Sequence, residues 1–110
     1  MKIPNCEKAI IDTAKLTEYT LNPEHPRGKH KALLFKDLLG IELADANTLL
    51  SWIREALLKK NAELGLKDQF GQRYVLDFSK THLGREVTIR TTWIIRTNEN
   101  FPRMVSCFIF

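Results

Sequence analysis

The segment Glu86-Val87-Thr88-Ile89-Arg90-Thr91-Thr92-Trp93-Ile94-Ile95-Arg96 alternates apolar and polar side chains over most of its length. Successive side chains of an extended strand point to opposite faces of a sheet, so this pattern predicts one long strand with two different faces. One face carries Val87, Ile89, Thr91, Trp93 and Ile95, and the other carries Thr88, Arg90, Thr92, Ile94 and Arg96. We expect the first face to pack under helices and the second to present arginines and hydroxyl groups.

Two further strands are predicted on either side of this segment, from Arg73 to Phe78 and from Met104 to Phe110. The residues His82-Leu83-Gly84 predict the hairpin turn between the first two strands, with glycine where positive φ is required. The stretch Asp68-Gln69-Phe70-Gly71, ahead of the first strand, is expected to form part of a loop. The sequence after about residue 67 therefore predicts an antiparallel sheet.

Helical periodicity dominates the sequence before residue 67. A short helix is expected from Thr13 to Leu21, because Asn22-Pro23 stops it. A second is expected from Gly28 or Lys29 to Leu39, with Gly40 ending it, and a third from Asp45 to about Asn61. The order of elements predicts a single α+β domain over residues 1–110, with N-terminal helices packed on one face of a C-terminal antiparallel sheet.

The composition is that of a soluble globular domain, with 44% hydrophobic and 27% charged residues in a chain of 110. No apolar run approaches the ~20 residues that a membrane-spanning helix needs. The first residues lack the apolar centre of a signal peptide, so we expect a cytoplasmic protein that does not engage a membrane. The net charge of +4 favours an anionic partner without identifying one.

Metal and cofactor chemistry finds little support in the sequence. Cys6 and Cys107 lie far apart and outside any metal-ligand spacing, and Cys107 is expected to be a buried core thiol. Asp77 is the one acidic residue well placed inside a predicted strand, and no carboxylate pair accompanies a histidine. Glycine-rich nucleotide-binding motifs are absent. We therefore expect neither a metal nor a cofactor.

The basic stretch that follows Leu21-Asn22-Pro23 is the best candidate for chemistry. It places two histidines, His25 and His30, together with Lys29 and Lys31, between a proline-flanked turn and a helix. Histidine exchanges protons near neutral pH, and clustered cations bind phosphate. The alternative, a solvated basic start of a helix, accounts for the same residues equally well.

These residue types suit metal-free cleavage of RNA by its own 2′-hydroxyl group. That reaction needs a base, an acid and cations that stabilise the charge on phosphorus. His25 or His30 would transfer protons, and Lys31 and Arg90 would stabilise charge. The substrate-binding candidates are His30, Thr92, Arg96 and Arg103, with Thr88 and Ser106 as further hydroxyl donors. An exposed sheet face explains the alternating arginines and threonines without any function.

The same motifs resemble a known family. The run Leu21-Asn22-Pro23-Glu24-His25-Pro26 is followed by Gly28, Lys31, Ala32, Phe35, Gly71, Tyr74, Arg90, Trp93 and Pro102-Arg103. This set is similar to an uncharacterised bacterial family of short chains and C-terminal modules of secreted proteins, in a gene setting typical of toxin–antitoxin pairs. The resemblance extends from about Ile3 to Phe110.

The order of elements is also similar to that of the barnase, EndoU, colicin D and RelE class of toxin ribonucleases. This resemblance implies a ribonuclease toxin, or a domain derived from one, that acts on RNA and is controlled by a small antitoxin or immunity protein. It assigns roles to His25, Lys31, Arg90, Thr92 and Arg103 by location. The alternatives are a non-catalytic interaction module and a module that binds nucleic acid without cleaving it.

Overall fold

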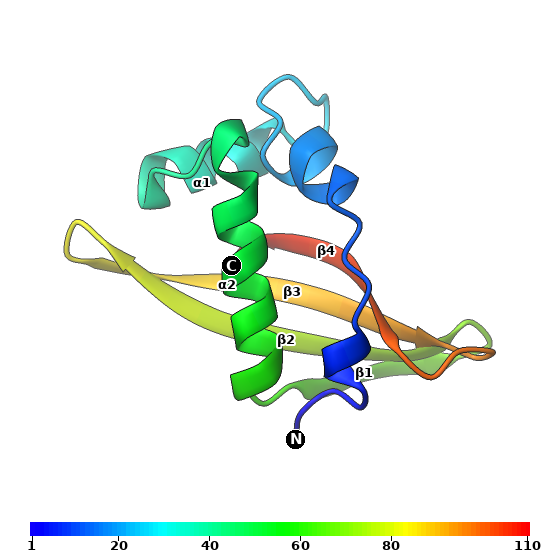
Figure 1. Ribbon diagram of the computed structural model, residues 1–110. Coiled ribbons are helices and arrows are strands. Elements are labelled where there is room, and N and C mark those ends of the chain that lie inside the picture. Colours follow the sequence, from blue (N-terminus) through cyan, green and yellow to red (C-terminus); the bar gives the residue numbers. More distant parts are fainter.

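A computed structural model describes all 110 residues of the chain and shows two α-helices beside a four-stranded antiparallel sheet (Figure 1). The helices are α1 (Lys29–Leu39) and α2 (Ala46–Lys59), and the strands are β1 (Glu63–Asp68), β2 (Gly71–His82), β3 (Arg85–Arg96) and β4 (Pro102–Ile109). The chain also has three short helical turns. Two precede α1, η1 (Cys6–Lys8) and η2 (Leu16–Thr20), and the third, η3 (Leu43–Asp45), lies between α1 and α2. The strands lie in the order β1-β2-β3-β4, so each strand pairs with its neighbours in sequence.

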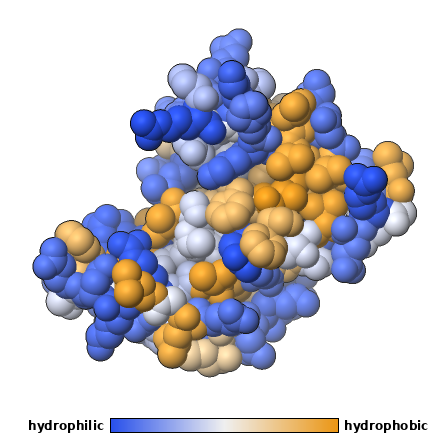
Figure 2. Space-filling model, turned by 180° about the vertical axis from the view of Figure 1, so that it is seen from behind, coloured by the Kyte–Doolittle hydropathy of each residue, from blue (hydrophilic) through white to orange (hydrophobic).

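The helices cover one face of the sheet, and α2 runs across the strands (Figure 1). The opposite face, seen in Figure 2, has no helix over it and mixes hydrophilic and hydrophobic groups. A core of 21 buried residues lies between the helices and the sheet. The structure thus confirms the predicted α+β class, with helices in the N-terminal half and an antiparallel sheet in the C-terminal half.

Strand β3 has the two faces that its alternation predicts. Val87, Ile89, Thr91 and Trp93 are buried beneath the helices. Ile94 is also buried, although it lies on the other face, where Arg73 and Arg103 flank it in the register of the neighbouring strands. Long arginine side chains can shield an apolar neighbour with their aliphatic parts.

The hairpin between β2 and β3 forms at the predicted place. Leu83 and Gly84 both have positive φ, 50° and 78°, as a two-residue hairpin turn requires. Strand β2 begins at Gly71 and ends at His82, and it therefore extends beyond the predicted range of residues 73–78 at both ends. Pairing with all of β3 accounts for the extra length.

Strand β1 is absent from the predicted elements, and its last residue, Asp68, falls in the predicted loop. All six of its residues are exposed, so the segment shows no alternation between buried and exposed positions. Its pairing with β2 also shifts between Leu64 and Lys67, which marks a β-bulge. An edge strand that buries nothing leaves no hydrophobic pattern for sequence analysis to find.

The helices agree more closely with expectation. Helix α1 begins at Lys29 and ends before Gly40, whose φ of 66° is the left-handed conformation expected after a helix. Helix α2 ends at Lys59, close to the predicted end. The first predicted helix is reduced to the π-helical turn η2, in which Leu16 and Thr20 are buried.

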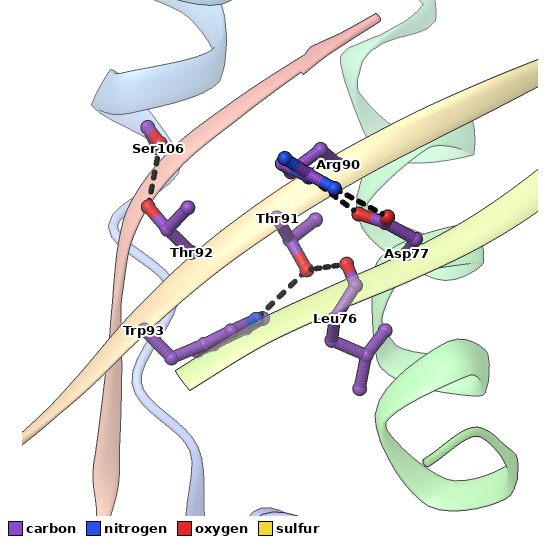
Figure 3. Close-up of polar contacts among 7 residues, drawn as sticks. All are labelled: Leu76, Asp77, Arg90, Thr91, Thr92, Trp93 and Ser106. Carbon is purple, nitrogen blue, oxygen red and sulfur yellow. Dashed lines mark hydrogen bonds and ion pairs between the residues drawn. The ribbon is translucent and has the colours of Figure 1, made fainter. Parts of the chain in front are cut away.

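A hydrogen-bonded chain inside the core explains a buried hydroxyl on β3 (Figure 3). The indole N–H of Trp93 donates to the Thr91 hydroxyl, which donates to the Leu76 carbonyl, both at 2.8 Å. No buried side-chain polar atom in the structure lacks a partner. None of the helices has the length and apolar character that a membrane crossing requires.

Candidate functional site

A groove of about 320 Å³ lies at the outer edge of β4, where η2 and α1 meet the sheet. Its lining residues are Lys15, Tyr19, Thr20, Lys31, Val105 and Ser106, and we call it the Lys31 groove. The Thr20 hydroxyl donates to the carbonyl of Cys107 at 3.2 Å and so ties η2 to this edge of the sheet. The groove is therefore built by segments far apart in sequence.

The Lys31 ammonium group lies between two aromatic rings. Its Nζ atom is 5.0 Å from the ring centre of Tyr19 and 4.9 Å from that of Phe108. None of the five ion pairs in the structure includes Lys31, and the two rings attract its charge without neutralising it. A cation without a carboxylate partner remains available to an anionic ligand.

Buried Cys107 lies on β4, close to Lys31. Burial raises the pKa of its thiol to about 12, because a thiolate loses its hydration there, and the nearby charge of Lys31 opposes this shift. The expected core thiol is thus confirmed as buried. Its raised pKa leaves it protonated and poorly nucleophilic at neutral pH.

The histidine of the Pro-flanked turn caps the start of α1. The Nδ1 atom of His25 accepts hydrogen bonds from the backbone N–H groups of Arg27 (3.0 Å) and Gly28 (2.9 Å). The His25 carbonyl accepts a third, from the N–H of Lys29 at 2.9 Å. These bonds satisfy donors that the first turn of a helix leaves free.

Asn22 and Gly28 complete the turn. The Asn22 side-chain oxygen accepts from the N–H of Glu24 at 3.0 Å, which forms an Asx turn. Gly28 packs so closely on η2 that a Cβ atom there would lie 2.5 Å from the Tyr19 carbonyl oxygen. Much of the distinctive Asn-Pro-x-His-Pro-x-Gly pattern is therefore explained by the turn itself.

This turn places His25 against the groove. The imidazole ring meets the Tyr19 ring edge-on, with 4.6 Å between the ring centres, and Lys31 lies over the same Tyr19 ring. Because Nδ1 is an acceptor in this arrangement, the proton of the neutral imidazole is on Nε2. His25 and Lys31, predicted separately, are thus joined through Tyr19.

Thr92 reaches the same groove through a neighbouring hydroxyl group. Its Oγ1 atom lies 2.6 Å from the Oγ atom of Ser106, and the two residues face each other on β3 and β4 (Figure 3). Ser106 lines the Lys31 groove. The pair therefore brings the Ser106 hydroxyl group to the groove, with Thr92 as its hydrogen-bond partner.

Arg90 lies further along β3 and is held by a carboxylate. Its guanidinium forms two parallel hydrogen bonds to Asp77 on β2, at 2.9 and 3.0 Å (Figure 3). These bonds raise the pKa of Arg90 above its ordinary value. The same guanidinium stacks 3.7 Å from the ring centre of Phe110, and Arg90 pairs in register with Phe108. Asp77 neutralises much of the charge that Arg90 would offer a phosphate.

Arg103 and Arg96 lie at the other end of the strands, beside Glu99. Arg103 donates two hydrogen bonds to the Glu99 carboxylate, at 2.9 and 2.8 Å, and Arg96 approaches it at 4.0 Å. Hydrogen bonding by Arg103 lowers the pKa of Glu99. Arg96 is about 13 Å along β3 from Thr92, at roughly 3.3 Å per residue. These two arginines form a cluster apart from the Lys31 groove.

His30 lies on the other side of α1. It lines a second groove with Lys29, and not the groove that contains Lys31. The structure therefore brings His25, Lys31 and Thr92 together and places Arg90 nearby. It separates Arg96, Arg103 and His30 from them.

Sequence reasoning missed the aromatic residues of the site. Tyr19 precedes the basic stretch within a short helical turn, and Phe108 lies in an apolar run that reads as core. An aromatic that closely precedes a histidine–lysine cluster was the only available signal for Tyr19. Nothing local distinguishes Phe108 from a core residue, because its contact with Lys31 spans 77 positions of the chain.

Three comparisons place the chain among known proteins. No curated protein sequence matches it. Among solved structures, it is similar to a contact-dependent growth inhibition toxin–immunity protein complex from Klebsiella pneumoniae 342, with a TM-score of 0.67 and 13% identity. That similarity covers 96% of this chain and 96% of the other, and at this identity it concerns the fold. A family model described as a domain of unknown function, DUF6883, matches residues 2–110, and the chain therefore belongs to this family.

Proposed function

We propose that this domain is a metal-independent ribonuclease of a toxin–immunity system, or a domain derived from one, and that RNA binds in the Lys31 groove. The observation that carries the proposal is the unpaired ammonium group of Lys31, held between Tyr19 and Phe108 beside the hydroxyl group of Ser106. A cation, hydroxyl donors and aromatic rings in one groove match a phosphate with an adjacent base.

The proposed reaction is attack of the RNA 2′-oxygen on the adjacent phosphorus. The bond from phosphorus to the 5′-oxygen breaks, and the products end in a 2′,3′-cyclic phosphate and a 5′-hydroxyl group. Lys31 stabilises the negative charge that grows on the phosphate oxygens, and Ser106 with Thr92 donates hydrogen bonds to them.

Proton transfer falls to Tyr19 in this proposal, with His25 as its positioning residue. Tyr19 lines the groove, and its phenol gives its proton to the leaving 5′-oxygen while it takes the proton of the attacking 2′-hydroxyl group, so that it ends the step as a phenol again. His25 already uses Nδ1 to accept two backbone N–H groups, which leaves Nε2–H as a hydrogen-bond donor. Its edge-on contact holds the Tyr19 ring in place.

A protein partner of the immunity kind belongs to the same proposal. The solved structure with the similar fold is a toxin–immunity protein complex. A ribonuclease inside its own cell requires an inhibitor, and partners of this kind bind through complementary charge and buried apolar side chains.

The test is cleavage of transfer RNA and total RNA by the purified, partner-free chain in the presence of EDTA. We expect cleavage that leaves 2′,3′-cyclic phosphate ends. Lys31→Met keeps the aliphatic stem and removes the charge, so it should reduce the cleavage rate by about 10²–10³-fold. The matched control is Lys29→Met on the other side of α1, which should cleave at the rate of the unmodified chain.

The result that would contradict this proposal is intact RNA at every enzyme concentration tested. Equal loss of cleavage in the Lys31 and Lys29 variants would instead show that general charge, and not the groove, is responsible. Cleavage that EDTA abolishes would replace the metal-free reaction with a metal-dependent one.

The second candidate function is a non-catalytic module that binds a protein or nucleic acid. Engagement of Arg90 by Asp77 and of Arg103 by Glu99 favours it, because both arginines already have carboxylate partners. Under this alternative, RNA binds with a steep dependence on salt and stays uncleaved, or does not bind at all.

A further inference from the structure

The largest groove of the molecule lies between α1 and the η3 turn and has a volume of about 590 Å³. We call it the α1–η3 groove. Its apolar lining includes Leu33 and Leu43, which are both about half exposed although leucine gains free energy by burial. Apolar side chains gathered in an open groove mark a surface that a partner covers.

The rim of this groove is basic. Lys29, His30 and Lys36 line it, and Glu42 is its single carboxylate. Glu42 pairs with Lys36 at 3.6 Å, with both side chains largely exposed, so that ion pair is weak. Lys29 takes part in no ion pair of the structure. An acidic partner would supply the carboxylates that this rim lacks.

The α1–η3 groove is separate from the Lys31 groove. Residues two positions apart on an α-helix differ by about 160° around its axis. Lys31 is two positions from both Lys29 and Leu33, so it lies on nearly the opposite side of α1. A partner seated in the α1–η3 groove thus leaves the Lys31 side chain uncovered.

The chemistry of the groove selects a helix of a protein over RNA. Most of its lining comes from α1 and from the η3 turn, with Leu21 and Pro23 added from the turn before α1. The lining has no phenylalanine, tyrosine or tryptophan ring for a base to stack on, and the Glu42 carboxylate repels phosphate. An amphipathic helix places apolar side chains at i, i+3, i+4 and i+7 into such a groove.

We infer that the α1–η3 groove is a docking site for an acidic amphipathic helix of a protein partner. Leucine-like side chains of that helix bind against Leu33 and Leu43, and its carboxylates pair with Lys29 and His30. The docking site itself does not depend on the proposed function. Only the identification of the partner as the immunity protein rests on it.

The experiment measures binding of a labelled 16-residue peptide to the full chain by fluorescence anisotropy. The peptide carries leucines at i, i+3, i+4 and i+7 and glutamates on its other face. We expect saturable binding that Leu33→Gln and Lys29→Glu each weaken by about tenfold or more. The matched control is Leu58→Gln on α2, because Leu58 and Leu33 are equally exposed, at 53%, and Leu58 lies outside the groove.

A charge-inverted peptide with lysines in place of the glutamates should bind at least tenfold more weakly. No saturable binding of the acidic peptide, or equal affinity for both peptides, would overturn the inference. So would loss of transfer RNA binding or of self-association in the Leu33→Gln variant, since either would identify another occupant. Cleavage of RNA is measured in a separate assay. If the chain does not cleave RNA, the peptide-binding result still tests the docking site.

Discussion

At the scale of single residues, the turn around His25 shows how one side chain serves structure and site together. Its Nδ1 atom holds the start of α1, and its ring supports Tyr19, over which Lys31 lies. A histidine that reads as a proton-transfer group in the sequence is thus also a helix cap. The structural role needs only a hydrogen-bond acceptor at the position of Nδ1, whereas proton transfer needs a ring that gains and loses a proton.

Two substitutions separate these roles of His25. Asparagine accepts backbone N–H bonds at a helix start nearly as well as any residue, whereas alanine accepts none. If His25 acts by holding the turn before α1 through its Nδ1 acceptor, His25→Asn should keep most of the RNA cleavage and thermal stability that His25→Ala loses. Tyr19→Phe, which keeps the ring and removes the hydroxyl, should lower cleavage by about 10²-fold or more.

Cleavage rates of the three variants with the same RNA check this prediction, and thermal unfolding confirms that each is folded. An equal loss of cleavage in the asparagine and alanine variants, with both folded, would show that cleavage requires the imidazole ring itself and not only its hydrogen bonds to the turn.

At the scale of elements, the connection from β3 to β4 depends on Glu99. Its carboxylate accepts two hydrogen bonds from Arg103, four residues later, and lies near Arg96 at the end of β3. This cluster fixes the tight return of the chain while the backbone N–H of Glu99 donates to the Arg96 carbonyl. The arginines that the sequence suggested for substrate binding thus have a structural use.

Glu99 predicts a dependence of stability on acid. Its pKa is lowered from 4.5 in the folded state, mainly by the Arg103 hydrogen bonds, so the ionised form favours folding. This contribution is present above about pH 4.5 and is lost as the pH falls through the lowered value. Glu99→Gln should therefore lower the urea midpoint at pH 7 and have a diminishing effect towards pH 3.

The matched control is Glu86→Gln, since Glu86 is exposed and has no ion-pair partner. Its urea midpoint should follow that of the unmodified chain at every pH. A Glu99→Gln effect of constant size from pH 7 to pH 3 would show that the carboxylate charge is not what stabilises the turn.

At the scale of the whole molecule, α1 is the element that joins fold to function. Phe35 anchors it in the core, Lys31 lines the Lys31 groove at the β4 edge, and Leu33 lines the α1–η3 groove. One short helix thus positions both candidate surfaces. Its attachment to the sheet decides whether either surface exists.

Replacing Phe35 by alanine should therefore destabilise the entire domain. A fully buried phenylalanine costs about 3–5 kcal/mol on truncation, and a domain of this size has only about 5–15 kcal/mol of stability. Leu34→Ala on the exposed side should cost far less. Urea unfolding measures both, and a loss below about 1 kcal/mol for Phe35→Ala would contradict the burial of Phe35 in the core.

The sequence by itself determined the elements whose pattern is local. Alternation predicts the faces of β3, periodicity and Gly40 predict α1, and His82-Leu83-Gly84 predicts the hairpin. Each depends on dihedral preferences and burial within a few neighbouring residues. Strand β1 escaped prediction because it buries nothing and so carries no such pattern.

Only the tertiary structure decided which candidate residues meet. Lys31 contacts Phe108, and Ser106 joins Thr92, across long stretches of chain that packing alone brings together. Asp77 and Glu99 engage Arg90 and Arg103, and no local rule predicts which carboxylate reaches which arginine. Residue types suggest chemistry, but the distances between side chains follow from how α1, η2 and the sheet pack against one another.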